Sequence, residues 1–394
     1  MIKNYLWMMV VTMTGVLVAC TKDGDTIYVS DPNEEQASTA PLVTVIYDAN
    51  ALGDNSYNDL IYEGVERAAL ELGLRTMQQS PRTYDEGLQY LELMFQQMET
   101  AQDSVRRLFI VTSPGYDDFI RQNNKRLEAN PYADLLYLET RTPLEGKGST
   151  LFLTYYGAMY EGGRIEAATE RTSALLVGAN RQTPAITEAL QGYRDGFEAG
   201  LKLLTEKQAS QNHLASTYLD ETGKSGFSVA DTTALRLLRQ WRNADISTVV
   251  PVCGGASNTF TRMINSTLED MDIVGIDTYS DIYFSSYSIV KHIDRAIAQC
   301  IRQWLNDGMM PKHQTLGLAD GYTEVIVNPQ RDIYIWTPSG YEGDSAPCLT
   351  PEMKQEIHDE AVRKEEESLT PSPGLTPNPS PKGEGRIKGE GSSY

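Results

Sequence analysis

The sequence predicts an α/β protein built from two doubly wound lobes, each around a parallel sheet. Short apolar runs of strand length alternate with longer segments of helical periodicity, and Gly- and Asp-bearing turns follow the strands. The chain has 394 residues and contains too many such units for one compact sheet. At about 100–200 residues per domain, this length also favours two domains. The apolar content of 40% is sufficient for two cores.

The first strand–helix unit shows the pattern most clearly. Residues 42–48 form a short apolar run, typical of a strand buried on both faces. Apolar residues then recur at intervals of three and four over 55–73, which predicts a helix capped by Asn55 or Ser56 and ended by Gly73. Further strands are predicted at 107–113, 135–139, 173–179, 215–219, 247–252 and 272–276, and further helices at 116–129, 184–205, 231–241 and 256–269.

Both ends of the chain differ from this pattern. Lys3, an apolar stretch and the ending Leu-Val-Ala-Cys predict a lipoprotein signal peptide over 1–20 with lipidation at Cys20; an ordinary secretory signal is the alternative. Residues 21–40 are polar and predict a flexible tether. A charged helix is predicted at 349–367, and the Pro-, Ser- and Gly-rich residues 368–394 predict a disordered tail.

Composition and missing motifs exclude several classes of protein. The 34 basic and 54 acidic residues give a formal charge of −20, which disfavours nucleic acid as a partner. A single long apolar run excludes a multi-span membrane protein. The sequence contains no P-loop, no Gly-x-Gly-x-x-Gly and no Gly-x-Ser-x-Gly, so neither a cofactor nor an enzyme of these types is expected. A hydrolase that uses two carboxylates stays open, because spatial pairs are invisible in sequence.

The histidines and cysteines do not form a metal-binding pattern. The four histidines make no His-Glu-x-x-His helix, and Cys253, Cys300 and Cys348 lie in no Cys-x-x-Cys pair. No metal site is therefore predicted. Cys253 and Cys300 lie in apolar runs and are expected to be buried thiols, although one disulfide is an alternative.

Six segments, in order along residues 42–327, resemble the basic-membrane-protein family of purine-nucleoside-binding lipoproteins of bacterial ABC importers. They are Gly53-Asp-Asn-Ser-Tyr-Asn-Asp59 with Tyr62-Glu-Gly64, Gly178-Ala-Asn180 with Gln191 to Gly200, Val250 to Asn258, Val274-Gly-Ile-Asp277, Ser288 to Asp294, and Leu316-Gly-Leu-Ala-Asp-Gly321. The chain departs from the family at three positions: Tyr57 stands for the usual Phe, Glu139 for the usual Asp, and Cys253 precedes the Gly-Gly turn.

The resemblance implies a type I periplasmic-binding-protein fold, with two lobes joined by a multi-strand hinge. Lobe one would contain 41–140 plus 291–313, and lobe two 141–290 plus 314–348. The family function implies a lipid-anchored solute-binding protein of the bacterial cell envelope, with a nucleoside, purine favoured, bound between the lobes. Its partners would be that ligand, an ABC transporter permease and, through the lipid, the membrane.

Residues that follow strands are the candidate ligand contacts, because ligands of such sheets bind beyond the carboxyl ends of the strands. Asp277 ends an apolar strand, and a carboxylate can accept both hydroxyls of a ribose diol, although it could instead cap the next turn. Asn58 offers the donor and acceptor that a purine edge needs, or caps the first helix. Asp54 could accept a base or ribose proton, or be solvated.

The other candidates are aromatic, cationic or flexible. Tyr57 and Tyr116 could stack on a base or belong to the core. Lys291 lies inside an apolar strand, so it is expected to reach the ligand, pair with Asp277 or face solvent at an edge. Gly254 and Gly255 would let the backbone approach a ligand closely, or form a simple turn.

Three other functions fit parts of the sequence. The same fold could bind a sugar or another small polar metabolite. A sensory or surface lipoprotein could bind a protein partner, with an occluded cleft and an exposed apolar patch. An enzyme would bring a histidine or a pair of acids with shifted pKa values together in the cleft.

Overall fold

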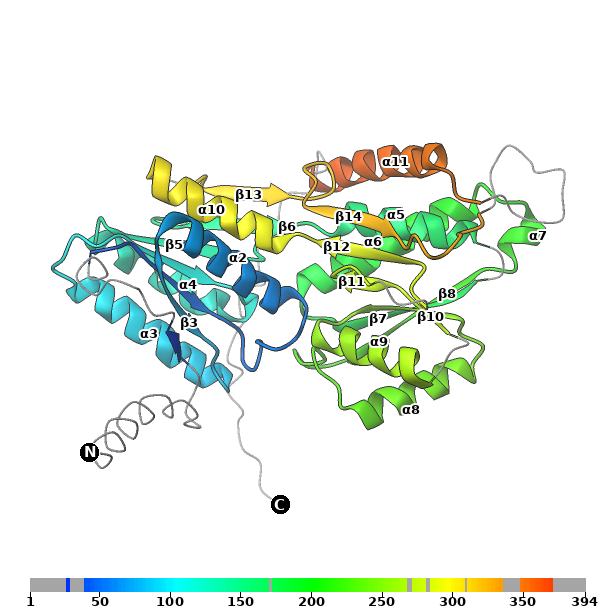
Figure 1. The fold of residues 1–394 in the computed structure, drawn as a ribbon, viewed down its shortest axis with the longest axis horizontal. Coiled ribbons are helices and arrows are strands. Elements are labelled where there is room, and N and C mark those ends of the chain that lie inside the picture. The colour runs from blue at the N-terminus through cyan, green and yellow to red at the C-terminus, as the bar shows by residue number, and fades with distance from the viewer. Residues whose placement is uncertain are drawn as a thin grey trace, which may run out of the picture.

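The computed structural model describes residues 26–28, 39–169, 172–267, 271–280, 284–308, 310–335 and 348–370. Two lobes lie side by side, each built around its own parallel sheet (Figure 1). This arrangement confirms the predicted fold class. The predicted signal peptide with Cys20, most of the 21–40 tether and the tail beyond residue 370 lie outside the described residues. No helix within the described ranges is long and apolar enough to cross a membrane.

The first lobe contains a seven-stranded sheet in the order β1-β3-β2-β4-β5-β6-β13. All neighbouring strands are parallel except β1, which is antiparallel to β3. The strands are β1 (Thr26–Tyr28), β2 (Leu42–Ile46), β3 (Arg75–Gln79), β4 (Arg107–Val111), β5 (Ala133–Leu138), β6 (Ser149–Leu153) and β13 (His313–Leu316). Strand β1 lies inside the flexible tether predicted at 21–40. Residues 26–28 of that tether are therefore hydrogen-bonded into the sheet.

Helices cover both faces of this sheet, which explains its continuous apolar strands. Helices α2 (Tyr57–Leu72) and α10 (Ile293–Asp307) pack side by side on one face (Figure 1). Helices α3 (Tyr84–Thr100) and α4 (Asp117–Asn123) cover the other face, with 3-10 turns at Pro114–Tyr116 and Asn124–Ala129. Successive residues of β4 alternate between the two cores: Leu108 and Ile110 face α2 and α10, and Phe109 and Val111 face α3.

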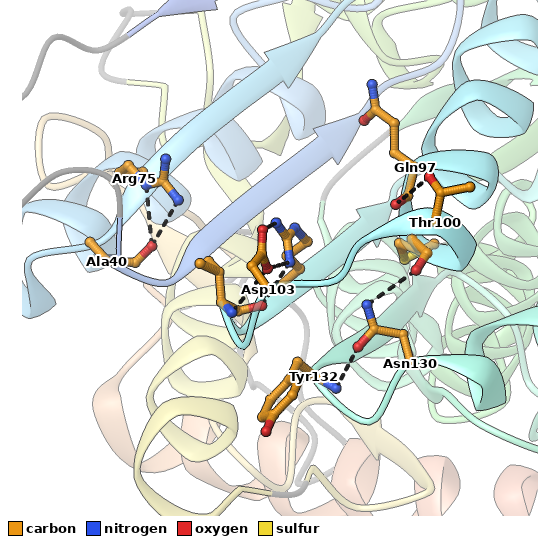
Figure 2. Close-up of polar contacts among 10 residues, drawn as sticks. Ala40, Arg75, Gln97, Thr100, Asp103, Asn130 and Tyr132 are labelled. Atoms are coloured by element: carbon orange, nitrogen blue, oxygen red, sulfur yellow. Dashed lines mark hydrogen bonds and ion pairs between the residues drawn. The ribbon is translucent and has the colours of Figure 1, made fainter.

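The amino ends of the first lobe's strands are fixed by polar contacts between loops (Figure 2). The Arg75 guanidinium, at the start of β3, donates two hydrogen bonds to the carbonyl of Ala40. Asn130 joins the end of α3 to the turn before β5: its Nδ2 donates to Met98 O and its Oδ1 accepts from Tyr132 N. This edge of the sheet is therefore occupied by structural contacts, and the opposite, carboxyl edge is where a site can form.

The second lobe has a four-stranded parallel sheet and a three-stranded sheet. Their orders are β10-β9-β7-β8 and β11-β12-β14, and β14 is antiparallel to β12. The strands are β7 (Ser173–Asn180), β8 (His213–Asp220), β9 (Thr248–Val252), β10 (Asp272–Ile273), β11 (Gly275–Asp277), β12 (Tyr287–Lys291) and β14 (Thr323–Val327). The helices are α5 (Tyr156–Ala168), α6 (Pro184–Leu201), α7 (Glu206–Ala209), α8 (Asp231–Arg242) and α9 (Gly255–Thr267).

The chain passes between the lobes three times: from β6 to α5, from β12 to α10, and from β13 to β14. Strand pairing places β6 and β13 wholly in the first lobe's sheet. The lobe boundaries expected from the sequence, at residues 140/141 and 313/314, would cut through this sheet. Because β6 and β13 are hydrogen-bonded into the first lobe's sheet, the first crossing follows residue 153 and the last follows residue 316.

The described cysteines are free thiols. Cys253 and Cys300 are buried and Cys348 is exposed. Burial raises the pKa of both buried thiols to about 12. They therefore remain protonated at neutral pH, in agreement with the predicted buried thiols.

Helix α11 (Pro351–Leu369) packs along α5 of the second lobe (Figure 1). Thr350 caps its start by accepting a hydrogen bond from Met353 N. The helix extends two residues into the predicted disordered tail, which is explained by packing of its last turns. Glu365 is 2% exposed and accepts hydrogen bonds from backbone N–H groups of Gly157, Leu318 and Ala319.

Burial raises the pKa of Glu365 from 4.5 to about 7; the Glu188 carboxylate adds to this shift, and the three N–H donors oppose it. Unfolding returns the group to its ordinary pKa. The folded protein thus binds the proton more tightly, so this contribution to stability is fully present below about pH 4.5 and is lost as the pH rises through about 7.

We expect Glu365→Gln to reduce the fall in unfolding free energy between about pH 5 and about pH 8, by roughly 1–3 kcal/mol. Urea denaturation of the chain from residue 21 at both pH values measures this change. Glu366→Gln is the matched control, because Glu366 is exposed on the same helix. Equal pH slopes for Glu365→Gln and the wild type would contradict the prediction.

Candidate functional site

Two strand-ending acids, one from each lobe, define the centre of the site. Asp277 is the last residue of β11 in the second lobe, and Glu139 directly follows β5 in the first lobe. Both have left-handed backbone conformations, with φ of 66° and 56° respectively. Such conformations are costly for non-glycine residues and cluster at functional sites. The backbone therefore turns sharply at both strand ends and directs two carboxylates toward the inter-lobe boundary.

Lys291 lies between these acids. It is the last residue of β12, and its Nζ lies 2.7 Å from Oε1 of Glu139; the two side chains are 6% and 7% exposed. Lys291 thus pairs with Glu139, a partner that was not among the three alternatives considered from the sequence. An unpaired buried ammonium would cost several kcal/mol, so the acid is necessary for the lysine to be charged here.

Asp277 also links the lobes. Its Oδ2 accepts a hydrogen bond of 2.7 Å from Oγ of Ser56, the residue that precedes α2. Burial raises the pKa of the Asp277 carboxyl; the Lys291 charge and the Ser56 bond oppose this shift. Its backbone N–H donates to the Tyr155 hydroxyl at 2.9 Å, and Tyr155 donates to Ile289 O.

Tyr57 adds an aromatic ring and a hydroxyl to the cluster around Lys291. Nζ of Lys291 lies 5.2 Å from its ring centroid and 5.6 Å from that of Tyr155, both within the range of cation–π attraction. Burial raises the pKa of Tyr57 well above its usual value, and the Glu139 and Asp277 carboxylates add to the effect. The hydroxyl therefore remains protonated and able to donate.

Two buried polar atoms of this cluster, the Tyr57 hydroxyl and Oε2 of Glu139, make no hydrogen bond of full geometry with a described residue, and the nearby Glu139 carboxylate helps to raise the pKa of Tyr57. A buried donor or acceptor left unpaired costs about 1–3 kcal/mol. One of these atoms can donate and the other accept, so together they match a polar group that can do both.

Asp54 and Asn58 bind each other at the start of α2. Asp54 accepts hydrogen bonds from the backbone N–H groups of Ser56, Asn58 and Asp59, and Asn58 Nδ2 donates to Asp54 Oδ2 at 2.9 Å. In this arrangement Asp54 caps the amino end of the first helix, and the Asn58 side chain is held by Asp54.

Gly254 and Gly255 lie where the lobes touch. Gly254 has a φ of +55°, and a Cβ on Gly255 would lie 3.2 Å from Cβ of Asp54. Next to them, Asn258 Nδ2 donates across the boundary to the carbonyls of Asp54 and Asn55, at 2.6 and 3.1 Å. The glycines thus permit a close approach, here of one lobe to the other.

Tyr116 is fully buried in the first lobe's core beneath α3. Its ring stacks on Tyr84 with centroids 5.3 Å apart, and its hydroxyl donates to the carbonyl of Tyr47. The structure thus brings together Asp277, Lys291 and Tyr57, sets Asp54, Asn58, Gly254 and Gly255 at the neighbouring lobe contact, and places Tyr116 in the core.

Sequence reasoning missed three members of the cluster: Glu139, Ser56 and Tyr155. Glu139 is the last residue of the predicted strand 135–139 and was named only as a departure from the family, although a position at a strand end is the signal used for Asp277. Ser56 was considered only as a helix cap. Tyr155 follows β6, a strand that was not predicted, so nothing in the sequence marked it. Among the described residues, no three His, Cys, Asp or Glu side chains could hold a metal ion.

Comparison by sequence found no relative: no model of a known protein family and no curated protein matches the chain. Solved structures do match. A solute-binding protein of an ABC transporter system from Aeropyrum pernix K1 has a TM-score of 0.60 at 19% identity, covering 84% of this chain and 90% of that one. A transcriptional activator of the comK gene from Bacillus halodurans has a TM-score of 0.56 at 12% identity, covering 86% and 100%.

A third structure, an ABC transporter solute-binding protein from Conexibacter woesei, has a TM-score of 0.53 at 12% identity and covers 84% of this chain and 98% of that one. At these identities the similarity establishes the fold. The chain has the two-lobed α/β fold of type I periplasmic binding proteins.

We expect Lys291→Met to lower the unfolding free energy by about 3–5 kcal/mol, because it leaves two buried carboxylates without their cation. Adding Glu139→Gln should restore part of the loss. Urea denaturation of the single and double variants measures both effects.

The control is Arg262→Met, which breaks an ion pair with Asp231 whose side chains are both more than half exposed. An exposed pair is worth at most about 1 kcal/mol. A Lys291→Met variant as stable as this control would contradict a buried charge cluster.

Proposed function

We propose that this chain is a solute-binding protein of an ABC importer and that it binds a nucleoside, purine favoured, between its two lobes. The observation that carries the proposal is the charged cluster at the inter-lobe boundary. There, Glu139 and Ser56 from one lobe meet Asp277 and Lys291 from the other. Side chains that a small ligand could bridge are thus supplied by both lobes.

The cluster suits a hydroxyl-rich ligand. A carboxylate is an acceptor and can take two hydroxyl donors, which matches a ribose diol at Asp277. The Tyr57 hydroxyl and Glu139 Oε2, which lie near each other, offer a donor and an acceptor beside it. Lys291 supplies further donors once the lobes separate. The resemblance to the basic-membrane-protein family, in which this fold binds purine nucleosides, supports the choice of ligand.

Closure of the lobes is the mechanism that this proposal implies. In the present arrangement the lobes touch through Asn258 and the Asp54 loop, and through Ser56 and Asp277. Opening about the three crossings would expose the cluster, and closure around a ligand would create a surface that a permease can distinguish. No covalent chemistry is required. A lipid at Cys20 would hold the protein at a membrane of the bacterial cell envelope.

A sugar is the second candidate ligand. One structure of similar fold is a periplasmic solute-binding protein from Actinobacillus succinogenes with bound D-allose, at a TM-score of 0.53 and 11% identity. A sugar would use the same carboxylates and would not need a stacking ring.

Two further alternatives have one feature each in their favour. The acids Glu139 and Asp277 do converge, as an enzyme would require, but Glu139 is paired with Lys291, whose charge also acts on Asp277. The closed lobe contact would also suit a protein-binding lipoprotein, yet its interior is charged and not apolar.

We expect the unlipidated chain from residue 21 to bind purine nucleosides saturably in isothermal titration calorimetry, more tightly than pyrimidine nucleosides or D-ribose. Asp277→Asn should weaken binding roughly 10- to 100-fold, because a hydrogen bond to a charged group is worth about 1.5–3 kcal/mol. Since burial raises the pKa of Asp277, acidification should weaken binding at a higher pH than for an exposed aspartate.

The matched control is Asp245→Asn, because Asp245 is an exposed aspartate of the second lobe that also has a positive φ, of 60°. It should bind like the wild type. Binding of D-allose or D-ribose without any nucleoside binding would replace the nucleoside by a sugar. If a folded, ligand-free sample binds neither class, the solute-binding proposal fails.

A further inference from the structure

Helix α11 contacts two of the three crossings between the lobes through one side chain. Oε2 of Glu365 accepts a hydrogen bond from Gly157 N at 3.0 Å, just after the β6–α5 crossing. Oε1 accepts from Leu318 N at 2.8 Å and from Ala319 N at 3.4 Å, in the β13–β14 crossing. A single carboxylate therefore holds the backbones of two crossings that are more than 150 residues apart in sequence.

The two crossings also contact each other beneath this carboxylate. Thr154 N donates to Leu316 O at 2.9 Å, and the Thr154 hydroxyl donates to Glu188 Oε1 at 2.6 Å. A Cβ on Gly317 would collide with both Glu365 and Thr154. The backbone segments and the carboxylate are thus packed without spare room, so bending either crossing disturbs its contacts with Glu365.

The third crossing is tied to the same loop. His292 N, between β12 and α10, donates to Tyr322 O at 2.8 Å, and Tyr322 N donates to Gly317 O at 2.9 Å. All three crossings are consequently connected to the segment that Glu365 holds.

Three further side chains of α11 fasten the helix to the second lobe. Arg164 on α5 pairs with Glu360 at 3.0 Å, and Tyr160 donates to the same carboxylate at 2.6 Å. His358 lies 2.9 Å from Glu161, and Lys354 Nζ donates to the carbonyl of Val325 in β14 at 2.6 Å. The body of the helix therefore moves with the second lobe, while its last turns bear on the hinge.

We propose that α11 is a hinge clamp, which favours the closed arrangement of the lobes by holding the crossings in their present geometry through Glu365. Hinge bending changes the φ and ψ of the crossing residues. Opening would draw Gly157, Leu318 and Ala319 out of register with the carboxylate, and a buried carboxylate that loses its donors is costly. Release of Glu365 thus shifts the equilibrium toward the open form.

The first test measures lobe separation without ligand. Spin labels at Leu93→Cys in α3 and Gln240→Cys in α8, both exposed, report one distance between the lobes in a Cys348→Ser background. The buried Cys253 and Cys300 remain unlabelled. We expect Glu365→Ala to increase the population at longer distances at least fivefold, and Glu365→Gln to give a smaller increase. Glu366→Gln, an exposed neighbour, should match the parent protein.

An unchanged distance distribution in folded Glu365→Gln and Glu365→Ala, or a shift to shorter distances, would overturn the clamp. Circular dichroism shows whether each variant is folded, and the conservative Glu365→Gln keeps the test valid if Glu365→Ala unfolds. The second readout rests on the proposed function: nucleoside affinity should fall severalfold in Glu365→Gln. Because the distance measurement needs no ligand, failure of nucleoside binding leaves the clamp testable.

Discussion

The placement of one buried ammonium group determines how the two lobes can meet. Lys291 ends the strand from which the chain returns to the first lobe; it pairs with Glu139 of the first lobe, and its charge acts on Asp277 of the second. Buried charges are tolerated only when they are paired, so the three groups must be buried together or exposed together. Closure of the lobes therefore buries Glu139, Asp277 and Lys291 together. Strand β12, which carries Lys291, sets the geometry of the closed form.

The rest of the fold brings the acids to this ammonium. Asp277 is the last residue of β11 and Glu139 directly follows β5; each takes a left-handed φ, which ends the strand and turns the side chain toward the boundary. Contacts between loops occupy the amino ends of the first sheet (Figure 2), so the polar groups at the carboxyl ends remain available. This division agrees with the general position of ligand sites in open α/β sheets.

The parts of the fold that the sequence predicted are those with a simple pattern. Leu42–Ile46 and Arg107–Val111 are buried on both faces, and α2 has one apolar face, so both patterns could be recognised. Helix α5 was missed because it is buried all round and contains Gly157, Gly162 and Gly163, which give no amphipathic stripe. The same limit applies to the site. Asp277 and Lys291 follow strands or lie in them, whereas the pairing of Lys291 with Glu139 depends on a contact 152 residues away in sequence.

Strand β1 sets the reach of any anchor at the N-terminus. Thr26 pairs with Gln79 at the outer edge of the first sheet, and only five residues lie between it and Cys20. The six Cα-to-Cα steps from Cys20 to Thr26 span at most about 20 Å. An acyl chain on Cys20 would therefore hold the first lobe close to the lipid headgroups. The linker would be much shorter than a flexible tether formed by all twenty residues of 21–40. The second lobe would then be the one that moves relative to the membrane when the lobes open. A permease in the same bilayer would meet the protein in a restricted range of orientations.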